Sequence, residues 1–266
     1  MAADDIDRVL LRDRLASAVR EAGALALHMF RGRPASWIKG ASSPVSEADL
    51  AVDALLRERL LAIRDAGWLS EETEDDPARL QRAEVWVVDP IDGTRAYLAG
   101  LAEWVIAAAL VRFGRPLVAA LYAPVSDELF LSVAGGGATL NGAPIKASAG
   151  DQLAGATFSG AKRRLDSLAA VEPRIVTAPR IPSLALRLAR VATGALDGTF
   201  VAAEDVNAAV HHRLRRIDLT IAADMRISLL TRRVARIGER VLPTEIVPVV
   251  DRHADGDEGG VLSELA

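Results

Sequence analysis

The sequence predicts an α/β (α+β) protein in which helices and an antiparallel sheet form the first half and strands alternate with helices in the second. Apolar residues near the N-terminus recur at helical spacing. Short apolar runs with β-branched residues follow, and turn-forming dipeptides such as Asn141-Gly142 separate them. The chain has 266 residues, half of them hydrophobic, so it can build one large domain or two smaller ones with cores of their own.

The first half is predicted to contain two helices followed by a meander of strands. Ser46 and Asp49 resemble a capping box at the start of the second helix, and Gly67 is expected to stop that helix. A loop is expected over residues 40–44 and an acidic loop over residues 71–76. The predicted helices cover residues 5–30 and 50–66. The predicted strands cover residues 85–88, 104–112, 117–122, 129–133 and 138–145, the last stretch containing the turn at Asn141-Gly142.

A seam near residues 150–155 divides the chain in this interpretation into two subdomains, residues 1–148 and 149–266. In the second subdomain a helix is expected over residues 183–193, because its apolar residues fall on one face. Strands are expected over residues 157–159 and 174–177, and a turn followed by a strand over residues 195–201.

Composition excludes several classes of function. The chain carries 32 Lys and Arg against 36 Asp and Glu, a net charge of −4, which gives no general attraction to nucleic acid polymers or anionic membranes. A phosphorylated substrate must therefore be held by a metal ion or by a few placed cations. Cysteine is absent, which excludes disulfides, thiolate metal sites and a cysteine nucleophile. The N-terminus reads as an amphipathic helix and not as a signal peptide, so we expect a cytoplasmic protein.

The stretch from Trp86 to Gly100 carries the chemistry. A buried strand delivers Asp89 and Asp92 at its end, and two carboxylates this close are tolerated when a cation lies between them. The turn between them can aim the Ile91 carbonyl inward as a third oxygen ligand. Glu71 follows another short apolar run and supplies a further carboxylate. Oxygen-only ligands suit Mg²⁺ far better than zinc.

The turn after Asp89 and the acidic loop at residues 71–76, each taken alone, also have a simpler structural interpretation. Asp-Pro and Asp-Gly are ordinary turn formers, and the acidic loop at residues 71–76 could be a solvated surface loop. Their order in the chain, each after an apolar run, favours the metal site.

Three motifs resemble the inositol monophosphatase superfamily of metal-dependent, lithium-sensitive phosphatases. DPIDGT at residues 89–94 matches the signature of that family without a substitution, and LSEE at residues 69–72 resembles its upstream acidic motif. Lys39 followed by SPVSEAD at residues 43–49 resembles its N-terminal element. The resemblance covers roughly residues 5 to 201 and implies a layered sandwich of alternating helices and sheets, with the active site between two subdomains.

The resemblance also implies roles for individual residues. Glu71, Asp89 and the Ile91 carbonyl would hold a first Mg²⁺, Asp89 and Asp92 would share a second, and Asp49 would lie near a third. Glu71 and Thr94 would orient and deprotonate the attacking water. The residues implied or considered for substrate binding are Gly93, Thr94, Lys39, Lys162 and Ser183, although an N-cap role explains Ser183 equally well.

The sequence departs from the family after residue 201. The family adds a metal-binding Asp from a Trp-Asp-x-Ala-Ala motif, and this motif is not intact here. Asp218 is the chosen candidate for that ligand and Asp205 is the alternative, each with altered spacing. Loss of this carboxylate would weaken the second metal site.

The predicted function is hydrolysis of a small phosphorylated metabolite. The LSEET and YAPVSDELF segments most resemble the bacterial 3'(2'),5'-bisphosphate nucleotidases of the family. Inositol-1-monophosphatase and histidinol phosphatase are the alternatives. A catalytically weak or inactive relative that binds a phosphorylated ligand is an alternative of another class. Homodimerisation is common in such families, but nothing in the sequence shows it.

Overall fold

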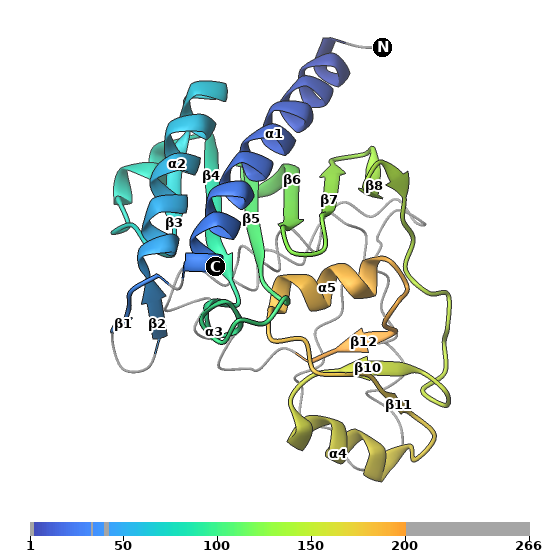
Figure 1. Ribbon diagram of the computed structural model, residues 1–266. Helices are drawn as coiled ribbons and strands as arrows, with labels where there is room; N and C mark the ends of the chain where they lie inside the picture. The colour runs from blue at the N-terminus through green and yellow to red at the C-terminus, as the bar shows by residue number, and fades with distance from the viewer. Residues whose placement is uncertain (1–2, 33, 40–42, 201–266) are drawn as a thin grey trace.

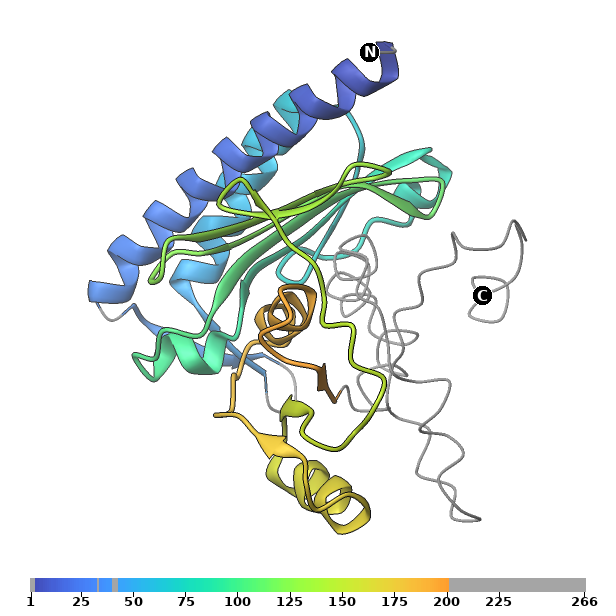
Figure 2. The same cartoon turned by 90° about the vertical axis from the view of Figure 1, so that its right-hand side faces the viewer.

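The computed structural model describes residues 3–32, 34–39 and 43–200, and these form alternating layers of helices and sheets (Figures 1 and 2). The predicted layered α/β sandwich is confirmed. In chain order the elements are α1 (Ala3–Gly32), β1 (Ser36–Lys39), β2 (Ser43–Ser46), α2 (Glu47–Ile63), β3 (Gly67–Ser70), the 3₁₀ helix η1 (Pro77–Gln81), β4 (Glu84–Asp92), α3 (Thr94–Leu98), β5 (Val105–Arg112), β6 (Arg115–Ala123), β7 (Glu128–Val133), β8 (Gly137–Leu140), β9 (Ala143–Pro144), β10 (Thr157–Ser159), α4 (Lys162–Val171), β11 (Val176–Thr177), α5 (Leu184–Ala192) and β12 (Gly198–Thr199).

In the described part of the chain, the largest sheet has seven strands in the order β3-β4-β5-β6-β7-β8-β9. From β4 onward each strand pairs antiparallel with the next, which confirms the predicted meander. The β3–β4 pair is parallel, with Ser70 opposite Val88. The carboxyl ends of these two strands therefore meet at the same edge of the sheet, and this edge carries the candidate site.

Both faces of the large sheet are covered, so its central strands are apolar throughout. Alternate residues of β5 face opposite sides, as strand geometry requires. Ala108 packs in the core with α1 and α2, while Ala107 and Ala109 pack in a second core with α5. The small alanine side chains allow the helices on both faces to approach the sheet closely.

Within the described residues, a smaller sheet has three parallel strands in the order β11-β10-β12. Helix α4 packs on it through Leu165 and Leu168, which share a core with Phe158. Figure 2 shows α5 between the large sheet and this smaller one. The predicted subdomain boundary at residue 148 falls between β9 and β10. It stays a prediction, because residues 201–266 lie outside the described residues.

Three local expectations need correction. Helix α2 ends at Ile63 and not at residue 66, and Gly67 opens strand β3 instead of ending the helix. Gly67 suits that place because a Cβ there would lie 2.9 Å from the Cβ of Arg79. Pro44, predicted in a loop, lies in β2, which pairs antiparallel with β1. Finally, the 3₁₀ turn η1 follows the acidic loop and was not expected.

Candidate metal and phosphate site

The candidate site begins where β3 and β4 end side by side. The Glu71 N–H donates a hydrogen bond to the Val88 carbonyl at 3.3 Å, which places Glu71 beside the residue that precedes Asp89. The Asp89 side chain is buried, and its carboxylate accepts a hydrogen bond from the Ile91 N–H at 3.1 Å. The parallel pairing thus brings the two predicted carboxylates to neighbouring strand ends.

The chain turns sharply after Asp89. The β4–β5 register shifts between Asp89 and Asp92, and Gly93 then adopts φ = +101°, a conformation that L side chains rarely take. A Cβ on Gly93 would lie 3.1 Å from the Glu103 carbonyl oxygen and 3.3 Å from the Ser183 Cβ. Glycine is favoured here by conformation and by the close approach of these neighbours, and α3 begins directly after it at Thr94.

Asp92 connects this turn to α5. Its Oδ2 accepts hydrogen bonds from the Ser183 hydroxyl and from the Ala185 N–H, the latter at 2.8 Å. The Ser183 Oγ also accepts from the Leu186 N–H at 3.0 Å, so Ser183 is the N-cap of α5. The capping interpretation of Ser183 is confirmed, and its contact with substrate stays a prediction.

Asp49 and Thr94 meet on the opposite side of the turn. The Thr94 hydroxyl lies 3.3 Å from Asp49 Oδ1 and 3.1 Å from the Ile91 carbonyl oxygen. Asp49 Oδ2 accepts hydrogen bonds from the Ser46 N–H and hydroxyl at 2.8 and 2.6 Å, the contact expected from the predicted capping box. Burial raises the pKa of the Asp49 carboxyl, and the hydrogen bonds from Ser46 and Thr94 act in the opposite direction.

The donor set fits Mg²⁺ in its chemistry, because it consists of carboxylates and one backbone carbonyl. Within the described ranges, however, no three Asp, Glu, His or Cys side chains lie close enough to hold one ion. The structure therefore does not show Glu71, Asp89 and Asp92 grouped around one ion. Their assignment as ligands stays a prediction.

Lys162, one of the predicted substrate-binding cations, is placed less favourably. Lys162 is on α4, its side chain is 87% exposed, and it forms an ion pair with Asp166 at 2.8 Å. Lys39 ends strand β1. Beside Ser183 lies a different basic feature, a cavity of about 210 Å³ whose lining includes Arg164, Arg180 and Arg187.

Two of the predicted residues fall outside the structural description. Asp218 and its alternative Asp205 both lie beyond residue 200. The question of the last metal ligand is therefore unchanged by the structure.

Sequence reasoning missed Asp53, which is buried one helical turn after Asp49 and accepts hydrogen bonds from Ser70 and Thr73. The available signal was its spacing: residues four apart on a helix share a face. A second acid on the inward face of α2 needs polar partners.

The family profile described as "Inositol monophosphatase family" matches residues 11–220. This chain belongs to the inositol monophosphatase family. It is 33% identical over 171 residues to an inositol-1-monophosphatase of Rhizobium meliloti, covering 60% of this chain and 64% of that protein. It is 34% identical over 131 residues to a histidinol-phosphatase of Chlorobaculum parvum, covering 48% and 50%. The chain thus spans less than two thirds of the length of these two relatives.

A solved structure agrees with this membership. The extragenic suppressor protein SuhB of Bartonella henselae superposes with a TM-score of 0.65 at 27% identity, over 71% of this chain and 76% of that one. The two named relatives are an inositol-1-monophosphatase and a histidinol-phosphatase, and neither is a bisphosphate nucleotidase. In the part of the chain that the structure describes, no helix is long and apolar enough to cross a membrane.

Proposed function

We propose that this chain is a Mg²⁺-dependent phosphomonoesterase whose substrate is a small phosphorylated alcohol of the inositol monophosphate type. The observation that carries the proposal is the meeting of Thr94 with Asp49 and the Ile91 carbonyl, directly after the buried Asp89. A hydroxyl held between a carboxylate and a carbonyl, at the end of a strand that carries two acids, suits a site that handles water and phosphate together.

In this proposal Glu71, Asp89, the Ile91 carbonyl and Asp92 would hold the metal ions, and Asp218, outside the described residues, would complete the set. When bound, Mg²⁺ supplies positive charge to the phosphate oxygens and lowers the pKa of water.

The remaining residues orient the reactants. Thr94, held by Asp49, orients the attacking water, and Glu71 accepts its proton. The backbone N–H groups of Gly93 and Thr94 face the phosphate at the start of α3. Lys39, Lys162 and Ser183 are the proposed contacts to the rest of the substrate.

The reaction needs neither a nucleic acid polymer nor a membrane as partner. A cytoplasmic location and a homodimeric state belong to the same proposal. Neither the fold nor the family fixes the substrate, because pocket residues decide specificity.

The test is phosphate release from three substrates, inositol 1-phosphate, histidinol phosphate and adenosine 3',5'-bisphosphate, with Mg²⁺ and with a chelator. We expect Mg²⁺-dependent turnover and the highest kcat/KM on inositol 1-phosphate. A higher kcat/KM on histidinol phosphate or on the bisphosphate would reassign the substrate and keep the reaction class. The Glu71→Gln variant is the control for contaminating phosphatase.

The weak or inactive phosphate-binding relative remains the second candidate, and the altered sequence after residue 201 favours it. Absence of turnover on all three substrates at millimolar Mg²⁺, together with retained binding of inorganic phosphate, would select it.

A further inference from the structure

The acid Asp53 lies inside the protein, on the face of α2 that meets the end of β3. Only 7% of Asp53 is exposed, and a buried carboxylate is costly unless hydrogen-bond donors satisfy it. Both of its oxygens have such donors: the Ser70 hydroxyl donates to Oδ1, and the Thr73 hydroxyl donates to Oδ2 at 2.6 Å. Asp53 therefore ties α2 to the chain segment that leaves β3.

That segment carries Glu71 between the two tied residues. The Ser70 Oγ also accepts a hydrogen bond from the Glu72 N–H at 3.2 Å, and the Glu71 N–H is held by the Val88 carbonyl at 3.3 Å. The backbone around Glu71 is thus fixed from two sides, by strand β4 and, through two hydroxyls, by Asp53. Both carboxylate oxygens of Asp53 accept hydrogen bonds from this loop, which favours a structural role for Asp53 over direct contact with substrate.

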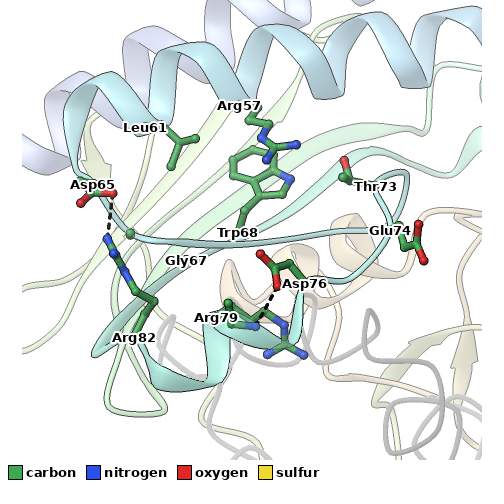
Figure 3. A pocket seen from close by; sticks show the side chains of 12 residues that line it. Arg57, Leu61, Asp65, Gly67, Trp68, Thr73, Glu74, Asp76, Arg79 and Arg82 are labelled. Carbon is green, nitrogen blue, oxygen red and sulfur yellow. Dashed lines mark hydrogen bonds and ion pairs between the residues drawn. The ribbon is translucent and has the colours of Figure 1, made fainter.

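The loop is anchored again where it ends. Asp76 accepts a hydrogen bond from the Ala78 N–H at 2.9 Å and caps η1, and the Arg79 guanidinium bonds Asp75. Between these anchors the loop backs onto a cavity of about 240 Å³, which Arg57, Trp68 and Thr73 help to line (Figure 3). The hydrogen bonds at its two ends hold the loop in place beside this cavity.

We propose that Asp53 is a positioning residue: it holds the loop at residues 70–73 so that Glu71 lies ready at the strand ends beside Asp89. This inference rests on the proposed function of Glu71 as a metal ligand. Partners that orient metal ligands matter strongly, and their loss typically costs about 10–100-fold in metal affinity or activity.

The test compares Asp53→Ala with Val52→Ala, a fully buried neighbour on the same helix that controls for lost stability. The first measurement is hydrogen exchange of the Glu71 and Glu72 amides in metal-free protein. We expect exchange at least about 10-fold faster in Asp53→Ala than in Val52→Ala, because only the former releases the loop.

The second measurement is the Mg²⁺ concentration that gives half of the maximal thermal stabilisation, together with kcat and KM. Asp53→Ala should need about 10-fold more Mg²⁺ and lose kcat with a smaller change in KM. The Asp53→Asn variant, which keeps one acceptor oxygen, should fall between wild type and Asp53→Ala.

Two outcomes would overturn the inference, and they are distinguishable. Equal loop exchange and equal Mg²⁺ requirement in Asp53→Ala and Val52→Ala would remove the positioning role and leave the proposed function intact. Absence of any Mg²⁺ effect on wild type would instead overturn the proposed function, and the inference with it.

Discussion

Replacement of Gly93 by alanine should damage both stability and activity, and the structure allows its cost to be estimated. Gly93 has φ = +101°, where a Cβ is strained by about 1–2 kcal/mol. The new Cβ would also lie 3.1 Å from the Glu103 carbonyl oxygen and 3.3 Å from the Ser183 Cβ. Overpacking of this kind adds about 1–3 kcal/mol, so the expected loss is about 2–5 kcal/mol.

Gly100 provides the matched control. It also has a positive φ, +74°, but a Cβ there would have no neighbour within 4 Å. Gly100→Ala should therefore lose only the conformational cost of about 1–2 kcal/mol.

The assay is urea unfolding of both variants, with thermal unfolding as a second measure. At about 2–4 °C per kcal/mol for a chain of this size, Gly93→Ala should melt several degrees below Gly100→Ala. Phosphatase activity should fall in Gly93→Ala alone, because only its Cβ displaces Ser183 and thereby Asp92. Equal stability and equal activity of the two variants would refute the close packing of α5 against the turn.

Three further predictions concern the Thr94 hydroxyl, one ion pair and the binding of Mg²⁺. Thr94→Val should lower kcat by about 10²–10³-fold in a phosphate-release assay. Thr94→Ser keeps the hydroxyl and should retain most of the wild-type kcat. Equal losses of kcat in the two variants would exclude a role for the hydroxyl. Glu128→Gln should lower the free energy of unfolding at neutral pH by about 1–2 kcal/mol, because Glu128 accepts two hydrogen bonds from Arg190 at 2.6 and 2.5 Å. The hydrogen bond from Arg190 lowers the pKa of Glu128 from 4.5. This stabilisation is therefore present above that value and is lost as pH falls through the lowered pKa. A stability difference between wild type and Glu128→Gln that stays constant across this pH range in urea unfolding would contradict the assignment. Mg²⁺ at about 100 times its dissociation constant should stabilise the protein by about 2.7 kcal/mol in thermal unfolding, reversibly with a chelator, and an unchanged melting temperature would argue against specific binding.

Elements with strong local patterns could be predicted from the sequence, and those defined by distant contacts could not. The turn at Asn141-Gly142 and the alternating runs beside it have local chemistry that predicts a hairpin, and β8 and β9 lie there. Strand β3 is only four residues long, and its parallel pairing with β4 depends on where α2 and the acidic loop lie.

The same division applies to the site. The acids at residues 89 and 92 follow a strand and a turn that can be recognised in the sequence, and both lie at the end of β4. Their role as metal ligands stays a prediction. Asp53 has no motif around it, and its role depends on Ser70 and Thr73, which lie 17 and 20 residues away. The Arg190–Glu128 pair, which joins α5 to the large sheet across 62 residues, is likewise invisible in local sequence.

A calorimetric titration of Mg²⁺ into wild-type protein and into the Asp89→Asn variant tests most directly whether the acids around β4 exist to bind divalent cations. Asp166→Asn, which alters an exposed acid on α4, is the matched control for loss of one charge. The account predicts saturable binding by wild type and by Asp166→Asn, and at least about 10-fold weaker binding by Asp89→Asn. Identical isotherms for all three proteins, or no binding by wild type, would contradict it.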